Sequence, residues 1–108
     1  MKVAETFPEV AVIMGHMGGD GMDGLGWRGG IDAARRRSNI YLEICGSELH
    51  KDRIQEAVEA MGHDRILYGS DMSLITPSLA IGMVQEAGIS KEAKEAIFYW
   101  NAKRLFGF

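Results

Sequence analysis

Three short apolar segments are spaced along the chain, and stretches with helical periodicity lie between them. The apolar segments are residues 10–14, 40–45 and 65–69, and each ends at or close to a glycine. Their aliphatic, β-branched and aromatic residues are typical of strands that are buried on both faces, as in a parallel sheet. The first and last segments show little strict alternation of apolar and polar residues, which a half-exposed antiparallel sheet would require. The pattern therefore predicts three parallel strands.

Amphipathic stretches that follow each predicted strand indicate helices. Apolar residues recur at helical spacing in residues 51–61, and Gly62 follows as a C-cap. Pro77 suits a first helical turn with Thr76 as its N-cap, and Ser90 is placed to cap the next helix. The predicted helices cover residues 27–37, 51–61 and 77–87, a helix that Ser90 opens, and a closing stretch at 101–106.

The order of these elements predicts an α/β fold. Strand, helix, strand, helix, strand and two further helices follow one another, with the strands about 25 to 30 residues apart, which is the spacing of consecutive βαβ units. The 108 residues contain no internal repeat, low-complexity stretch or domain linker. We therefore expect a single domain over residues 1–108.

Charge and cysteine content exclude several classes of partner. The formal net charge of −3 and the pI near 5.6 argue against general binding to nucleic acid or to an anionic membrane surface. No apolar run approaches the ~20 residues that a membrane-spanning helix needs, and residues 1–6 do not resemble a signal peptide or an anchor. The chain's single cysteine, Cys45, allows no internal disulfide, which fits a reducing compartment. We expect a cytoplasmic protein that binds neither nucleic acid nor membrane.

Candidate catalytic residues lie where the predicted strands end. His16 follows the first strand within a glycine-rich loop, Glu43 lies near the end of the second, and Asp71 follows the third. Ligands and catalytic residues gather at the C-terminal ends of parallel strands. If the second strand lies between the other two, the axes of the outer strands are about 10 Å apart. The side chains of His16 and Asp71 could then lean inward and share one water molecule or metal ion.

Each of these residues also has a structural interpretation. His16 could hydrogen-bond to the backbone and shape the glycine-rich turn, and Asp71 could be an N-cap or a turn residue. Glu43 stands in an apolar strand, where a buried carboxylate needs a partner, and the alternative is that it marks an exposed edge. The spacing alone leaves these alternatives open.

Other polar residues are interpreted as structural. Cys45 is expected to behave as a small buried hydrophobe, while His50 and His63 adjoin helix ends and are interpreted as capping residues. The glycine-rich residues 15–30 lack the Gly-Lys-Ser/Thr of a phosphate-binding loop. No two histidines lie four residues apart, which excludes the helix motif of a zinc protease.

Four motifs, taken in order, resemble the amidohydrolase-2 family. Residues 7–19, which include Ile-Met-Gly-His-Met-Gly-Gly, resemble its sixth barrel strand, and residues 38–43 resemble its seventh. Residues 64–71, Asp-Arg-Ile-Leu-Tyr-Gly-Ser-Asp, resemble its eighth strand, and residues 101–107 resemble its closing helix. The resemblance implies part of a (β/α)8 TIM barrel, consisting of its last three parallel strands with their helices.

This resemblance also implies metal-dependent chemistry. It indicates a hydrolase, decarboxylase or lactonase that acts on small, often aromatic, carboxylic acids and lactones. By resemblance, Asp71 binds the metal, usually zinc, and serves in acid–base catalysis. His16 lies beside the metal-bound water or the substrate as a polarising and proton-handling group, and in two-metal relatives the matching histidine is itself a ligand. A divalent cation lowers the pKa of its water toward neutrality, and a nearby carboxylate or imidazole moves the proton.

The chain departs from the family pattern in its length and at one position. The His-X-His pair of the first barrel strand and the histidine of the fifth have no counterpart, and a whole barrel takes about 250 residues. Glu43 stands where the family commonly has an aspartate. Because catalytic zinc sites normally use three protein ligands, we expect the chain alone to bind zinc weakly or not at all.

Two hypotheses of different classes follow. The leading one is a C-terminal fragment of a metal-dependent hydrolase or decarboxylase, inactive alone, whose complete form binds a small-molecule substrate. The alternative is a non-catalytic α/β half-barrel that acts as a binding or assembly module. Because strands cut from a closed barrel leave open edges and an uncovered apolar face, we also expect a homo-oligomer or pairing with an N-terminal half.

Overall fold

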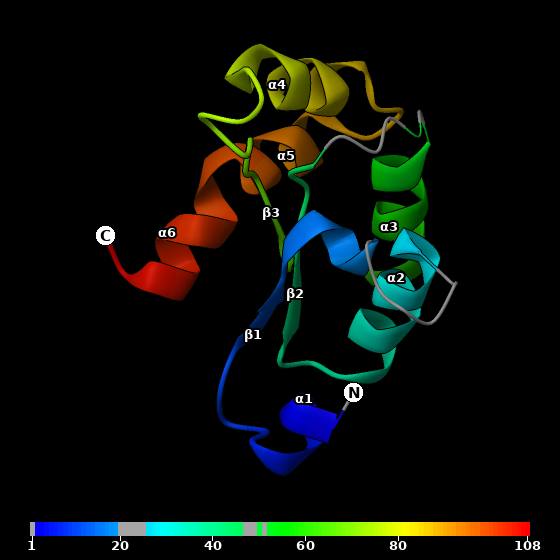
Figure 1. Ribbon diagram of the computed structural model, residues 1–108, viewed down its shortest axis with the longest axis vertical. Coiled ribbons are helices and arrows are strands. Elements are labelled where there is room, and N and C mark those ends of the chain that lie inside the picture. Colours follow the sequence, from blue (N-terminus) through cyan, green and yellow to red (C-terminus); the bar gives the residue numbers. More distant parts are fainter. Residues whose placement is uncertain (1, 20–25, 47–49, 51) are drawn as a thin grey trace.

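A three-stranded parallel sheet lies at the centre of the computed structural model (Figure 1). Its strands are, in chain order, β1 (Val12–Met14), β2 (Ile40–Glu43) and β3 (Ile66–Leu67). β2 is the middle strand; Met14 pairs with Leu42, which pairs in turn with Ile66. The predicted strands and their parallel arrangement are therefore confirmed, although each is shorter than its apolar segment. The structure describes residues 2–19, 26–46, 50 and 52–108.

Helices follow the strands in the predicted order. They are α1 (Lys2–Thr6), the 3-10 turn η1 (Gly15–Gly18), α2 (Trp27–Arg36), α3 (Arg53–Met61), α4 (Pro77–Glu86), α5 (Lys91–Glu95), the π-helical turn η2 (Ala96–Trp100) and α6 (Asn101–Phe106). Ser90 caps α5, since its Oγ accepts a hydrogen bond from the amide of Ala93 at 3.1 Å. The predicted first residue of α3, Lys51, lies outside the described residues, and α1 was not predicted. In the described part of the chain, no helix is long and apolar enough to cross a membrane.

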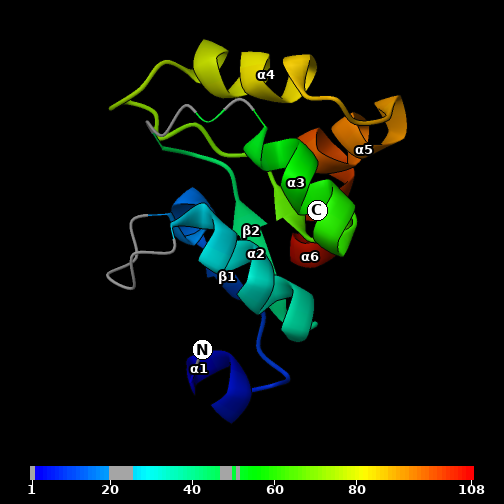
Figure 2. The same ribbon diagram turned by 90° about the vertical axis from the view of Figure 1, so that its right-hand side faces the viewer.

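The two faces of the sheet differ in how well they are covered. α2 and α3 lie side by side against one face (Figure 2), where Ile40, Leu42 and Ile44 are fully buried. On the other face, Ile13 is 41% exposed and its register partner Tyr41 is only partly buried. The helices therefore build the hydrophobic core on one side of the sheet and leave the opposite side more open.

The C-terminal helices pack along β3. The buried side chain of Asn101 donates hydrogen bonds to the carbonyl oxygens of His63 and Ile66 at 2.6 and 2.8 Å. The amide of Tyr68 donates to the carbonyl oxygen of Ile97 at 3.1 Å. These bonds fix the start and the end of β3, and so they determine where the segment after β3 begins.

Candidate functional site

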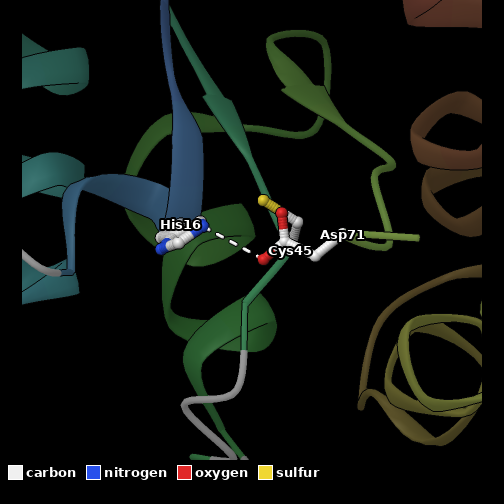
Figure 3. Close-up of side chains that lie close together, drawn as sticks. All are labelled: His16, Cys45 and Asp71. Atoms are coloured by element: carbon white, nitrogen blue, oxygen red, sulfur yellow. Dashed lines mark ion pairs between the residues drawn. The ribbon is translucent and has the colours of Figure 1, made fainter. Parts of the chain in front are cut away.

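Three side chains with metal-binding atoms meet at the C-terminal ends of the three strands (Figure 3). His16 lies in η1 directly after β1, Cys45 follows β2, and Asp71 follows β3. One ligand atom from each residue lies within 4.8 Å of the other two. Among the described residues, this arrangement brings together one nitrogen, one sulfur and one oxygen donor from three different strand ends.

His16 and Asp71 form the closest pair in this cluster. The Nε2 atom of His16 lies 3.1 Å from Oδ2 of Asp71, and the two side chains are 38% and 26% exposed. The strand order explains this approach: β2 separates the two strands, as the sequence analysis assumed, and both side chains lean across its end. The pair is accessible from solvent, and a catalytic role for it stays a prediction.

The backbone at both residues has an unusual conformation. His16 and Asp71 have φ values of 55° and 57°, in the left-handed region that non-glycine residues rarely adopt. The carbonyl of His16 accepts a hydrogen bond from the amide of Gly19, and that of Asp71 accepts from the amides of Leu74 and Ile75. Both residues therefore shape turns through their backbones while their side chains pair with each other. Strain of this kind costs about 1–3 kcal/mol per residue and is concentrated at functional sites.

Glycines allow the close approach of the elements that carry the site. A Cβ at Gly46, where φ is 102°, would lie 3.2 Å from Cγ of the His16 ring. A Cβ at Gly30 would lie only 1.9 Å from the carbonyl oxygen of Met17, so η1 rests directly on the backbone of α2. The position of the imidazole thus depends on two glycines in two different segments.

Glu43 is partly buried, and its carboxylate has hydrogen-bond partners in the same segment. Its Oε1 accepts a hydrogen bond from the amide of Cys45 at 2.9 Å, and its Oε2 accepts one from the thiol. Gly69 makes room for this carboxylate, because a Cβ there would lie 1.6 Å from Oε1. Since β2 is the middle strand, the interpretation of Glu43 as the mark of an exposed edge is wrong.

The thiol of Cys45 has a strongly shifted pKa. Its environment as a whole raises this pKa from 9.0 to about 12, and burial, which disfavours the charged thiolate, is the largest cause. The hydrogen bond to Glu43 is the next cause that raises it, whereas the backbone of His16 lowers it. The expected burial is confirmed, since Cys45 is 7% exposed. Cys45 was not predicted to belong to the site, although this residue follows a strand as His16 and Asp71 do.

Arg53 is a second residue near the site that the sequence analysis missed. It is the first residue of α3 and is fully buried. Its Nη2 donates to the carbonyl oxygen of Ile44 at 2.6 Å and to that of Cys45 at 3.5 Å. The signal in the sequence is its position four residues before Ala57, which places an arginine on the apolar face of the helix. Arg53 therefore holds the chain where it leaves β2.

The other two histidines lie away from this cluster. His50 precedes α3, and its ring centroid lies 5.0 Å from that of Trp27. His63 follows α3, and its Nε2 lies 3.3 Å from Oδ1 of Asp64. Both residues flank a helix, as the sequence analysis expected, and neither contributes a donor atom to the cluster of described residues.

The donor set fits a divalent cation. With metal–ligand distances of about 2.0 to 2.1 Å, neighbouring oxygen and nitrogen ligands of a tetrahedral ion lie roughly 3.3 Å apart. The separation of 3.1 Å between His16 and Asp71 is close to this value. Imidazole, carboxylate and thiol are all ligands of zinc and related ions. An ion could therefore take the place of the contact between His16 and Asp71 with little rearrangement.

Comparisons with known proteins agree with the fold. A family model described as Amidohydrolase matches residues 2–108. The chain is 25% identical over 125 residues to y4mH, an uncharacterized protein of Sinorhizobium fredii, with 98% of this chain and 42% of that protein covered. The chain therefore spans less than half the length of this curated relative.

Two solved structures show the same architecture. One is a dihydroxybenzoic acid decarboxylase from Polaromonas sp. JS666 with bound manganese and the inhibitor 2-nitroresorcinol. Its sequence is 23% identical to this chain, and the two structures superpose with a TM-score of 0.73. The match covers 97% of this chain and 36% of the decarboxylase. The other is a TIM-barrel protein from Bordetella bronchiseptica, 24% identical with a TM-score of 0.72, over 98% of this chain and 37% of that one. The predicted fold class, part of a (β/α)8 barrel with three parallel strands, is confirmed.

Proposed function

The chain belongs to the amidohydrolase family, and we propose that it contributes His16 and Asp71 to the active site of a metal-dependent hydrolase or decarboxylase. The observation that carries this proposal is the distance of 3.1 Å between Nε2 of His16 and Oδ2 of Asp71 at the C-terminal ends of parallel strands. That edge is where barrel enzymes bind substrate. The remaining active-site residues would come from barrel segments that correspond to the unmatched part of the longer relatives.

The proposed metal is a divalent cation, with zinc as the first candidate, and Asp71 is its proposed ligand with His16 beside it. When bound, such an ion would supply a Lewis acid that polarises a carboxyl or carbonyl oxygen. The chain's own pair handles the proton, because Nε2 of His16 lies 3.1 Å from Oδ2 of Asp71. Hydrolysis requires a proton to leave water, and decarboxylation requires one to reach carbon. A histidine held by a carboxylate suits either transfer.

The proposed substrate is a small carboxylic acid or lactone. A cation at a solvent-accessible strand end attracts carboxylates, and the His16–Asp71 pair leaves room for one because both side chains are partly exposed. The decarboxylase from Polaromonas, which is similar in fold, acts on a small aromatic acid of this class. The proposed location is the cytoplasm. The proposed partner is a second copy of this chain or an N-terminal half of the barrel.

Turnover by the complete barrel tests this function, with dihydroxybenzoates and small lactones as substrates. His16→Ala and Asp71→Asn should each reduce turnover by about a hundredfold or more, which is the scale of lost proton-transfer catalysis. Their combined loss should be much less than multiplicative, because residues that act as a unit are non-additive. His50→Ala and His63→Ala are the controls and should leave turnover nearly unchanged. If Asp71→Asn kept nearly full activity while His63→Ala lost it, the assignment of the site would be wrong.

A second candidate function is a non-catalytic α/β half-barrel that serves as a binding or assembly module. It is favoured by the exposure of Ile13 on the open face of the sheet. The same assay separates the two: a reconstituted barrel without turnover on any substrate of these classes would favour the module.

A further inference from the structure

We propose that Cys45 is a metal ligand, so that His16, Cys45 and Asp71 together form a three-ligand site for a thiophilic divalent cation such as zinc or cobalt. This inference rests on the proposed function in one respect, because it refines the metal site of that enzyme. It differs from the expectation drawn from the sequence, which named Asp71 alone as the ligand and placed His16 beside the metal as a proton-handling group. The third donor became visible only in the tertiary structure.

The geometry supports a shared ion. Tetrahedral ligand atoms that include one sulfur lie roughly 3.3 to 3.6 Å apart. His16 and Asp71 are already 3.1 Å apart, and one ligand atom from each of the three residues lies within 4.8 Å of the others. The separations within the set therefore have to shorten by no more than about 1.2 to 1.5 Å to reach these values. Three protein ligands would leave a fourth position open, as catalytic zinc sites do.

The backbone that carries the thiol is held in place from two sides. The amide of Cys45 donates to Glu43, and its carbonyl oxygen accepts from the buried Arg53 at 3.5 Å. Arg53 also holds the preceding carbonyl, that of Ile44, at 2.6 Å. The backbone at this strand end is thus held by hydrogen bonds on both sides of Cys45.

The proton of the thiol has a defined route. Coordination forms a sulfur–metal bond and breaks the S–H bond, because a thiol is deprotonated when it binds a metal. The thiol already donates to Oε2 of Glu43. That carboxylate accepts the proton and passes it to water. The positive charge of the ion then compensates the negative charge of the bound thiolate.

A thiolate in the ligand set determines which ions bind well. Thiolates favour zinc and cobalt, whereas oxygen-rich sites favour magnesium and manganese. The similar decarboxylase from Polaromonas contains manganese. We therefore expect this chain to bind cobalt and zinc more tightly than manganese.

Titration of the 108-residue chain with cobalt tests the proposal. Because Cys45 is the only cysteine, a thiolate-to-cobalt charge-transfer band in the near ultraviolet reports this one residue. The band should saturate at one cobalt per chain and disappear in Cys45→Ser. Affinity for cobalt should fall at least 10- to 100-fold in Cys45→Ser and Asp71→Asn, since even outer-shell changes cost that much. His63→Ala is the matched control, because it removes a histidine paired with a carboxylate outside the site, and it should change neither band nor affinity.

A second measurement avoids variants that fold poorly. In the unmutated chain, saturating zinc should slow the alkylation of Cys45 by iodoacetamide at least tenfold, and the same concentration of manganese should not. Circular dichroism in each sample confirms that the fold is unchanged.

Three results would overturn the proposal. Cobalt that binds without the band, and equally well in Cys45→Ser, would exclude the thiolate while leaving the proposed function intact. A band that persists in both His16→Ala and Asp71→Asn would show that the thiolate binds cobalt outside the three-ligand site. If cobalt did not bind and zinc did not protect Cys45 from alkylation, this chain would not contain a complete metal site. The proposed function would then be tested separately, by the turnover of the complete barrel.

Discussion

At the end of β2, a single carboxylate accepts hydrogen bonds from both the amide and the thiol of Cys45. The carboxylate belongs to Glu43, and it reaches this position because Gly69 has no side chain. A negative charge beside a buried thiol disfavours the thiolate. The chemistry of Cys45 is therefore determined by a residue two positions earlier and by a glycine on the neighbouring strand end.

Cys45 should react slowly with alkylating reagents in the folded chain. Its pKa of about 12, compared with 9.0 ordinarily, lowers the thiolate fraction at pH 8 by about 1000-fold. The rate with iodoacetamide, measured without metal, should rise about tenfold per pH unit up to pH 11. Glu43→Gln should accelerate the reaction, because it removes a cause of the raised pKa. The unfolded chain in denaturant is the control, and equal rates in the folded and unfolded chains would contradict the prediction.

The same shift has a consequence for stability. Because the folded pKa is raised, the contribution of this thiol to stability is fully present below about pH 9 and is lost as the pH rises toward 12. The free energy of unfolding should therefore decline above pH 9. In Cys45→Ala this part of the decline should be absent.

Among the helices and strands, the contact between η1 and α2 depends on a glycine. Gly30 lies inside α2, and the carbonyl oxygen of Met17 in η1 occupies the space where its Cβ would be. Gly82 lies inside α4, and a Cβ there would meet no described atom within 4 Å. By helix propensity alone, alanine should stabilise both helices.

We predict opposite effects of alanine at these two glycines. Gly82→Ala should raise the free energy of unfolding by about 0.5–1 kcal/mol, since alanine loses less backbone entropy than glycine. Gly30→Ala should lower it by about 1–3 kcal/mol, because the added methyl group forces η1 away from α2. It should also weaken metal binding, because His16 lies in η1. Denaturant titration of both variants measures the difference, and stabilisation of both would show that the close contact is absent.

At the scale of the whole molecule, the sheet is covered unevenly. Ile13 in β1, at one edge of the sheet, is 41% exposed, and Trp100 and Phe106 near the C-terminus are 53% and 61% exposed. An edge strand with exposed apolar residues pairs readily with other chains. In the structures that share this architecture, the match covers 36–37% of the length.

The chain by itself should self-associate. Light scattering over micromolar concentrations should show dimers or larger species, because burial of the open face is favourable. Ile13→Lys should reduce this association, since a charged residue at the edge blocks pairing. Ala60→Lys, at an exposed position of α3, adds the same charge elsewhere and should leave association unchanged. A monomer at all concentrations would contradict this prediction.

Local patterns in the sequence were sufficient for the order of elements and for part of the site. Buried parallel strands and amphipathic helices differ in hydrophobic period, so residues 40–45 and 51–61 could be assigned from spacing alone. His16 and Asp71 were predicted to converge because parallel strands bring their C-terminal ends to one edge, and the distance of 3.1 Å agrees with that argument.

The third donor and the supports of the site depend on contacts between segments that are distant in sequence. Cys45 looks like any small apolar residue in the sequence, and only the packing of β2 between β1 and β3 brings its sulfur to His16 and Asp71. Arg53 and Gly30 are likewise explained by what lies opposite them: two backbone carbonyls in one case, and a carbonyl of η1 in the other. Periodicity reports which side of an element is buried. Which atoms then lie within bonding distance is decided by strand order, by register and by left-handed turns at the strand ends, and these are properties of the assembled fold.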